Sequence, residues 1–234
     1  MLETILRTGF DQLSLPLEDS ALDRFQRYYH ILEERSQVMN LTAIHGEADV
    51  ARLHFLDCAA LLGLADFAGR QVIDVGSGAG FPGLVLKIAC PSLSLTMLDS
   101  LEKRVRFLEE LCHALALEDV CCLHARAEEA PREMRQSYDI AVSRAVARLD
   151  LLAELCLPFV KKGGLFLAMK GPAAEEELRD ARRGIALLGG QVEKVAEYPV
   201  PGTDLTHRAV IIRKVGETPA KYPRRWAQMK KQPL

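Results

Sequence analysis

The sequence lacks the features that mark membrane, secreted and metal-binding proteins. None of its apolar runs is long enough to span a membrane. The N-terminal stretch MLETILRTGFDQL is amphipathic, carries acidic residues and has no small-residue cleavage site, unlike a secretory signal. No two of the six cysteines form a C-x-x-C pair, which argues against a zinc site or a disulfide framework and predicts buried free thiols. We therefore expect no metal and no membrane contact, and we take the cytoplasm as the default compartment.

The chain also lacks an overall excess of basic residues. Its formal net charge is -2 at pH 7, which argues against a protein that coats nucleic acid without specificity. The charge is nevertheless uneven, because residues 218–234 contain no acidic residue and five basic ones, Lys221, Arg224, Arg225, Lys230 and Lys231. A basic tail on an otherwise acidic chain predicts local contact with a polyanion.

The length of 234 residues and the 49% hydrophobic content predict a globular protein with one substantial core. Apolar residues at helical spacing predict two helices ahead of any strand, at about residues 19–38 and 47–64. We expect these helices to form a cap, and we expect the protein to be a monomer.

From residue 71 onward, short apolar strands alternate with amphipathic helices. The expected strands are QVIDVG, LSLTMLD, VCCLHA, DIAVSR and GLFLAMKG, with helices at 102–116 and 149–160. This alternation predicts an α/β protein with a mostly parallel sheet. The last two strands, QVEKVAEYPVP and HRAVIIRKV, have no helix between them and should form an antiparallel hairpin.

A parallel sheet that ends in such a hairpin resembles the class I S-adenosylmethionine-dependent methyltransferase fold, which is Rossmann-like, more than a dinucleotide-binding sheet. We divide the chain into a helical cap (1–65), a methyltransferase core (66–217) and a basic tail (218–234), forming one structural domain overall.

The stretch VIDVGSGAGFPG follows the first strand and carries the strongest site signal. Residues 78–83 also match G-x-G-x-x-G, so a nicotinamide-dependent oxidoreductase is an alternative. The wider pattern, Asp74 with Gly76 and Gly78, favours S-adenosylmethionine instead. A carboxylate repels a pyrophosphate but attracts an amino group and a sulfonium. Asp99, which ends the second strand, should accept both ribose hydroxyls, and it does not distinguish the two cofactors.

The end of the fourth strand, DIAVSRA, indicates which atom is methylated. It lacks the Pro-Pro-aromatic motif of amino-group methyltransferases. The chain also lacks the Pro-Cys pair commonly used for pyrimidine C5, a reaction that needs a cysteine nucleophile. What remains is a target that needs no activation. Guanine N7 qualifies, because its in-plane lone pair can attack a methyl group directly once the reactants are positioned.

Several stretches resemble one known family: NLTAI, HFLDCA, DVGSGAGFPG, LDSLEKRVRFL, RAEE, SRAVA, LAMKG and KYPRR. They resemble the bacterial 16S rRNA (guanine-N7) methyltransferase G family, also called glucose-inhibited division protein B. The resemblance implies methyl transfer from S-adenosylmethionine to N7 of one guanine in 16S rRNA. It implies cofactor contacts at Gly76, Phe81, Asp99, Ser100, Ala127, Glu128 and Arg144. A non-catalytic RNA-binding factor on the same fold is the second alternative.

The candidates for substrate or RNA contact are Asn40, His54, Asp57, Lys103, Arg104, Lys170, Lys221, Arg224 and Arg225. Each has a plainer interpretation: a turn at Asn40, a solvated pair of His54 with Asp57, or a solvated basic face. Arg144 is expected to position the reactants through the cofactor carboxylate or an RNA phosphate, where the guanidinium can bind in a bidentate way. The chain departs from the family after KYPRR, and two interpretations of Trp226 stay open there: stacking on a base and packing on the core.

Overall fold

The computed structural model describes residues 1–234. The N-terminal region is helical, with α1 (Leu2–Gln12), α2 (Asp19–Met39) and then one continuous helical segment. That segment consists of α3 (Glu47–Val50), a π-helical turn (Ala51–Leu56), α4 (Asp57–Ala59) and a 3₁₀ turn (Ala60–Gly63). Both helices expected at 19–38 and 47–64 are confirmed, and the π-helical turn was not foreseen.

Seven strands form one sheet in the order β3-β2-β1-β4-β5-β7-β6. They are β1 (Gln71–Val75), β2 (Ser94–Asp99), β3 (Val120–His124), β4 (Tyr138–Arg144), β5 (Val160–Lys170), β6 (Gly190–Pro199) and β7 (Thr206–Lys214). The first five strands are mutually parallel, and β7 is antiparallel to both β5 and β6. The parallel sheet with a C-terminal antiparallel hairpin is therefore confirmed.

The helices of the core are α5 (Gly83–Ala89), α6 (Glu102–Ala114), α7 (Leu149–Cys156), α8 (Ala174–Leu187) and α9 (Trp226–Lys231). Helix α8 was not foreseen, because half of its residues are charged and only a narrow stripe is buried, at Ala174, Leu178, Ala181, Gly184 and Ile185. None of the helices is long and apolar enough to cross a lipid bilayer.

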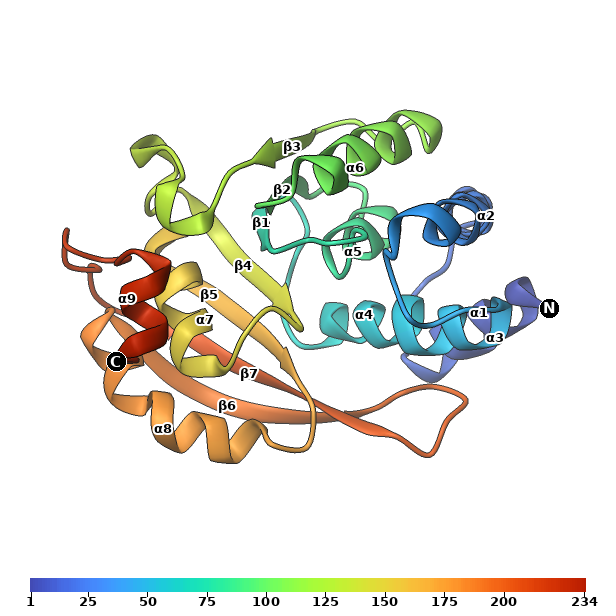
Figure 1. Ribbon diagram of the computed structural model, residues 1–234. Coiled ribbons are helices and arrows are strands. Elements are labelled where there is room, and N and C mark those ends of the chain that lie inside the picture. The colour runs from blue at the N-terminus through green and yellow to red at the C-terminus, as the bar shows by residue number, and fades with distance from the viewer.

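Alternate residues of each strand contribute to two separate cores. In β1, Val72 belongs to the core beneath α2, α5 and α6, whereas Ile73 belongs to the core beneath α7, α8 and α9. The same alternation holds at Ile140 and Ala141 of β4. Figure 1 shows the two sets of helices on opposite sides of the sheet. The short apolar strands are thus buried on both faces, as a parallel sheet requires.

The N-terminal helices pack onto the sheet beside the glycine loop that follows β1. The Tyr28 hydroxyl of α2 donates a hydrogen bond to the Ala79 carbonyl oxygen at 2.7 Å. The ring of Tyr28 stacks on Phe81, with 5.4 Å between ring centroids. The cap therefore fixes the position of the loop, and the two do not behave as independent units.

The strand order reverses between β1 and β4, which is the point where open α/β sheets bind ligands. The loops after β1, β2, β3 and β4 all leave the sheet at this edge. The candidate site lies there.

Candidate functional site

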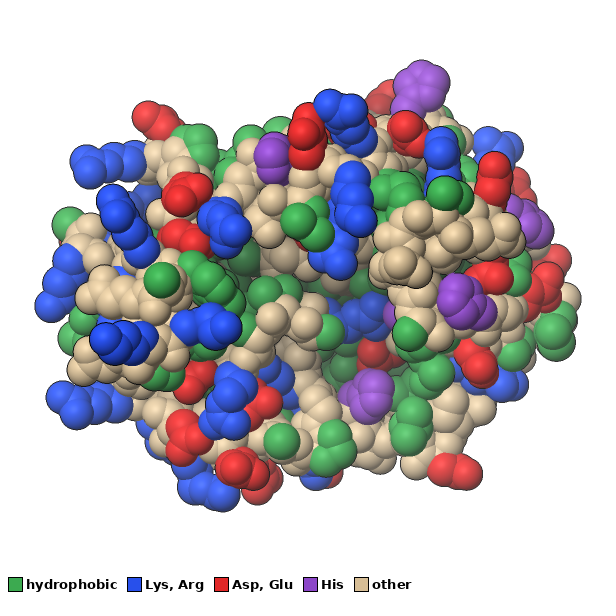
Figure 2. All heavy atoms as spheres, viewed as in Figure 1, with side chains coloured by type: hydrophobic (Ala, Val, Ile, Leu, Met, Phe, Trp, Pro, Cys, Tyr) green, Lys and Arg blue, Asp and Glu red, His purple; other side chains and the backbone are tan.

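Three neighbouring cavities open at this edge of the sheet, with volumes of about 320, 150 and 690 Å³. We call them the loop cavity, the small cavity and the large cavity. Figure 2 shows the molecule hollowed near the centre of this face, with basic side chains on the rim. The loop cavity shares Gly76, Ser100 and Val146 with the small cavity. It shares His54, Arg144, Ala145 and Val146 with the large cavity.

The glycine loop forms one wall of the loop cavity. Gly76 and Gly78 have positive φ angles of 77° and 58°, a conformation that glycine adopts without strain. A Cβ atom on Gly78 would meet no atom closer than 4.0 Å, so a side chain there would occupy cavity space. At Gly76 a Cβ atom would clash with the Val146 side chain. Gly78 therefore lets a ligand approach the backbone closely, whereas the missing side chain of Gly76 makes room for Val146.

Asp99 lies at the bottom of the loop cavity and ties the loops after β1 and β2 together. Its carboxylate accepts hydrogen bonds from the Gly78 and Leu101 backbone N–H groups, both at 2.9 Å. The Arg104 guanidinium lies 3.7 Å from Asp99 Oδ2 and also lines the cavity. Because each carboxylate oxygen can accept a second bond, Asp99 can still bind a pair of hydroxyl groups.

Asp74 is not exposed to any of the three cavities. It is completely buried, and its Oδ2 accepts a hydrogen bond from the Gly83 N–H at 2.8 Å. Its Oδ1 has no hydrogen-bond partner, and burial raises the pKa of the carboxyl group to about 7. The sequence analysis placed this carboxylate beside the cofactor, but the structure places it behind the loop, where it supports the start of α5.

The small cavity lies where β1, β2 and β3 end. Its apolar walls include Val75, Leu98 and Leu155, and its rim includes Ser100 and the segment 125–128. Ala127 and Glu128 thus meet Ser100 around one space, although they lie far from it in the sequence. Such a space, apolar inside and polar at the edge, suits a flat heteroaromatic ring.

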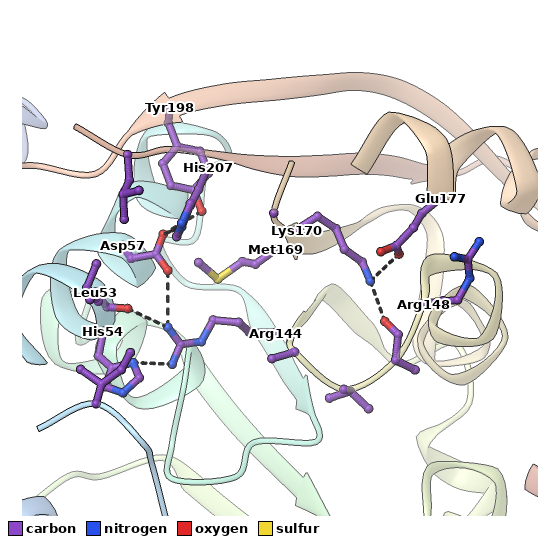
Figure 3. Close-up of a pocket in the computed structure, with 16 residues that line it drawn as sticks. Leu53, His54, Asp57, Arg144, Arg148, Met169, Lys170, Glu177, Tyr198 and His207 are labelled. Atoms are coloured by element: carbon purple, nitrogen blue, oxygen red, sulfur yellow. Dashed lines mark hydrogen bonds and ion pairs between the residues drawn. The ribbon is translucent and has the colours of Figure 1, made fainter. Parts of the chain in front are cut away.

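Arg144 forms the boundary between the loop cavity and the large cavity, and Figure 3 shows its contacts. Its Nη1 donates to the Leu53 carbonyl oxygen at 3.1 Å and to Asp57 Oδ2 at 3.4 Å. Its Nη2 donates to His54 Nδ1 at 2.8 Å, and the guanidinium lies 4.8 Å from the centre of the Phe81 ring. Three of its five N–H groups are therefore bound within the protein, while one on Nε and one on Nη2 are left.

His54 is held in one tautomer by these contacts. Burial and the Arg144 charge lower the pKa of His54 to about 3, so the ring is neutral. Because Nδ1 accepts from Arg144, the proton is on Nε2 and is donated to Thr42 Oγ1 at 2.8 Å. The ring stacks on Phe81 with 4.3 Å between centroids. The π-helical turn carries His54, and such turns are frequent at functional sites.

Asp57 is the centre of a second set of hydrogen bonds in the large cavity (Figure 3). Its Oδ1 accepts from the Tyr198 hydroxyl at 3.1 Å and from His207 Nδ1 at 2.8 Å. The hydrogen bond to Asp57 raises the pKa of His207. The structure thus brings Asp57, His54 and Arg144 together, and it excludes a solvated His54–Asp57 pair because both side chains are buried.

Sequence analysis missed Tyr198 and His207. They come from β6 and β7 and lie 141 and 150 residues from Asp57 along the chain. The pattern of the two final strands predicts only an antiparallel hairpin and does not indicate that these two side chains reach Asp57.

Lys170 and Glu177 lie across the large cavity from Asp57 (Figure 3). The Lys170 ammonium donates to the Ala147 carbonyl oxygen at 2.6 Å and lies 2.8 Å from Glu177 Oε2. The Leu149 N–H also donates to Glu177 Oε2, at 2.8 Å. Lys170 is therefore paired rather than free, and Glu177 is a site residue that the sequence did not reveal because α8 was not foreseen.

The remaining candidates lie away from the cavities. Asn40 is exposed and ends α2 in a left-handed conformation, with a φ of 48°. Lys103, Lys221 and Arg225 are exposed on the surface. Arg224 is different from the other basic residues of the tail, because its guanidinium is bound to the buried Glu154 carboxylate, with Nη2 at 2.6 Å from Oε2. The structure therefore gives Arg224 an internal role in place of an RNA contact.

Comparison with known proteins decides the family. The family described as rRNA small subunit methyltransferase G (GidB) matches residues 21–203. The chain belongs to the rRNA small subunit methyltransferase G family. It is 44% identical to "Ribosomal RNA small subunit methyltransferase G" of Clostridium botulinum strain Loch Maree, over 98% of each chain. It is 46% identical to the protein of that name from Alkaliphilus oremlandii, over 100% of this chain and 99% of the relative.

Solved structures agree on the fold. A SAM-dependent methyltransferase from Aquifex aeolicus aligns with a TM-score of 0.52 and 21% identity, over 71% of this chain and 93% of its own. The antibiotic-resistance methyltransferase Kmr aligns with a TM-score of 0.52 and 15% identity, over 68% of this chain and 93% of its own. The class I methyltransferase fold expected from the sequence is therefore confirmed. The family model ends at residue 203, whereas the Alkaliphilus oremlandii relative aligns over the whole of this chain.

Proposed function

We propose that the protein transfers a methyl group from S-adenosylmethionine to N7 of a guanine in 16S rRNA. The observation that carries this proposal is the junction between the loop cavity and the large cavity, whose common walls are His54, Arg144, Ala145 and Val146. A methyl donor in the first cavity and a base in the second would meet at these residues. Family membership supports the same assignment.

The residues of the loop cavity and the small cavity suit the cofactor. The open space in front of Gly78 admits the chain of the methionine part, and Phe81 lies in the wall beside it. Asp99 would accept the ribose hydroxyls, and Ala127 with Glu128 would lie beside the adenine. When bound, S-adenosylmethionine supplies an electrophilic methyl group on its sulfonium.

The side chains at the junction suit a reaction that needs no general base. His54 is the nearest candidate base, but its pKa of about 3 and its two occupied nitrogens prevent it from taking a proton. Guanine N7 has no proton to remove. Methylation places positive charge on the purine, and the Arg144 charge is balanced by Asp57 at 3.4 Å, which limits repulsion. Arg144 would then orient the reactants through its remaining N–H groups.

Glu177 is the residue that we assign to recognition of guanine. Its Oε1 has no hydrogen-bond partner in the protein, whereas Oε2 is bound by Lys170 and by the Leu149 N–H. The Watson–Crick edge of guanine carries two neighbouring donors, N1–H and the 2-amino group, which a carboxylate accepts. A guanine turned out of its stack into the large cavity could present that edge to Glu177. Adenine has an unprotonated N1 in that position and would be repelled.

The exposed basic residues would bind the RNA backbone. Arg104 of α6 lines the loop cavity, Lys103 precedes it on the exposed surface of the same helix, and the exposed basic residues of the tail are Lys221, Arg225, Lys230 and Lys231. Phosphate contacts of this kind add affinity without sequence specificity. We further propose that the protein acts as a monomer in the cytoplasm, on 16S rRNA or a small-subunit particle.

The test is methyl transfer from tritiated S-adenosylmethionine onto 16S rRNA taken from a strain without the enzyme, with and without ribosomal proteins. The product should be cleaved by the borohydride and aniline treatment that reports 7-methylguanosine. The single-turnover rate should be almost constant across neutral pH. A methylated product that resists cleavage would assign the methyl group to another atom. A log-linear rise of a chemistry-limited rate with pH would require a base.

A further inference from the structure

The C-terminal tail is tied to the core at several points before it reaches α9. The Arg135 guanidinium donates to the carbonyl oxygens of Thr218, Pro219 and Tyr222, at 2.6, 3.1 and 2.5 Å. The buried Lys214 ammonium donates to the Thr218 hydroxyl. The first part of the tail therefore follows a fixed path across the protein surface.

A buried ion pair then fixes the start of α9. Arg224 Nε lies 2.9 Å from Glu154 Oε1, and the Arg224 backbone N–H donates to the same oxygen at 2.8 Å. The Glu154 side chain is 1% exposed and belongs to α7. Met229, on the following turn of α9, is completely buried in the core beneath α7 and α8. Helix α9 is thus held against α7, as Figure 1 shows.

This arrangement places Trp226 in the wall of the small cavity. The indole shares the cavity with the apolar side chains of Val75, Leu98 and Leu155 and with the segment 125–128. The cavity volume of about 150 Å³ is of the size that holds a single aromatic ring. The large apolar face of a tryptophan is suited to contact with such a ring.

The walls that the small cavity shares with the loop cavity indicate which chemical group would occupy the small cavity. Gly76 and Ser100 line both, and Asp99 lies beside them. A nucleoside whose ribose hydroxyls bind Asp99 would extend its base past Ser100 into the small cavity. The polar rim of Ser100, Arg126 and Glu128 could meet the edge of that base while the apolar walls contact its faces.

We propose that Trp226 is part of the cofactor site and contacts the adenine ring of S-adenosylmethionine. This inference rests on the proposed function, since it needs an adenosine cofactor in these cavities. It assigns the tail a role in cofactor binding that the sequence analysis, which assigned the tail to RNA, did not foresee. Trp226 follows the KYPRR stretch, at the point where the sequence analysis finds a departure from the family pattern.

The chain provides its own probe, because Trp226 is its single tryptophan. The fluorescence of the full-length protein is titrated with S-adenosylhomocysteine, with 5′-methylthioadenosine, which keeps the adenosine, and with methionine, which does not. Calorimetry measures each affinity independently. We expect a saturable change in Trp226 emission with both adenosine compounds, at midpoints that match the calorimetric Kd, and no change with methionine.

Two variants complete the experiment. Trp226→Ala should weaken S-adenosylhomocysteine about tenfold, within the range for loss of base stacking on an aromatic side chain. Gln228→Ala changes an exposed residue of the same helix that lines none of the cavities, and it should leave the affinity unchanged. Thermal unfolding of each variant shows whether α9 still packs. The fluorescence of the unmodified protein tests the proposal even if Trp226→Ala is unstable.

The outcomes separate this inference from the proposed function. Calorimetry could detect binding of S-adenosylhomocysteine while the Trp226 emission stays constant during the titration and Trp226→Ala binds as tightly as the unmodified protein. In that case the inference is wrong and the proposed function stands. If rRNA fragments change the emission and the adenosine compounds do not, Trp226 contacts RNA and the inference is wrong. If no adenosine compound binds the unmodified protein, both fail.

Discussion

Replacement of Arg144 by lysine keeps the charge at the junction of the two cavities and removes the planar fork. The single ammonium group of a lysine can keep a bond to Asp57, but it cannot reach all the acceptors that the guanidinium fork binds. The His54 Nδ1 and the Leu53 carbonyl oxygen would then lose their donor. Each buried acceptor left without a donor costs about 1–3 kcal/mol. Since small shifts and water can recover part of this, we expect about 2–4 kcal/mol of lost stability.

That loss should be visible in thermal unfolding, because about 1 kcal/mol shifts Tm by roughly 2–4 °C in a chain of this size. Arg144→Lys should therefore lower Tm by about 5–15 °C. The matched control is Arg148→Lys, the same substitution in the wall of the same cavity. The Arg148 side chain is 52% exposed and pairs with Asp180 on the surface, and such pairs contribute about 0–1 kcal/mol. Its Tm should change little.

Catalysis should respond more strongly than stability. A displacement of about 1 Å in reacting groups can lower a rate about 100-fold, so we expect Arg144→Lys to reduce single-turnover methyl transfer by that order. The assay uses saturating S-adenosylmethionine and rRNA, at a temperature where both variants are folded. If Arg144→Lys matches Arg148→Lys in both Tm and rate, the three contacts of the guanidinium have no functional importance and the positioning role is refuted.

Three further changes test other parts of the site. The pKa of Asp74 is about 7 in the folded protein and about 3.9 when unfolded, so the unfolded state loses its proton first as pH rises. Stability should then fall by about 1.4 kcal/mol per pH unit between about pH 4 and 7, or about 4 kcal/mol in total. Asp74→Asn should lack this slope, and parallel denaturation profiles of the two proteins would contradict the assignment. Asp99→Ala should weaken S-adenosylhomocysteine about 10- to 100-fold in calorimetry, through loss of charge-assisted bonds worth about 1.5–3 kcal/mol, and unchanged affinity would remove Asp99 from the site. Glu177→Gln should slow methyl transfer to rRNA at least about tenfold with little effect on S-adenosylhomocysteine affinity, and an unaltered rate would exclude Glu177 from guanine recognition.

The sequence predicted the fold well because its strands and helices carry strong local patterns. The alternation from Gln71 onward predicted the parallel sheet, and the absence of a helix before β7 predicted the hairpin. The glycine loop and Asp99 were found for the same reason, since both are fixed by their position at the ends of strands.

The parts that the sequence did not reveal depend on contacts between distant segments. Nothing near Asp57 indicates that Tyr198 and His207 will share its carboxylate. In the sequence, nothing distinguishes Arg224 from the other basic residues of the tail. Only the structure shows that it pairs with the buried Glu154. Local patterns predict elements, whereas such pairings depend on how those elements pack.

The site draws its walls from both ends of the chain, with His54 and Asp57 from the N-terminal helices and Tyr198, His207 and Trp226 from the last strands and the tail. This arrangement has a consequence for biosynthesis. A nascent chain that has emerged only as far as β5 can hold the glycine loop and Arg144, but it lacks Tyr198 and His207, the two donors to Asp57 Oδ1, and one wall of the small cavity. A prematurely terminated product would be incomplete in the same way. The site is therefore complete only after β6, β7 and α9 have been synthesised and have packed against the earlier elements.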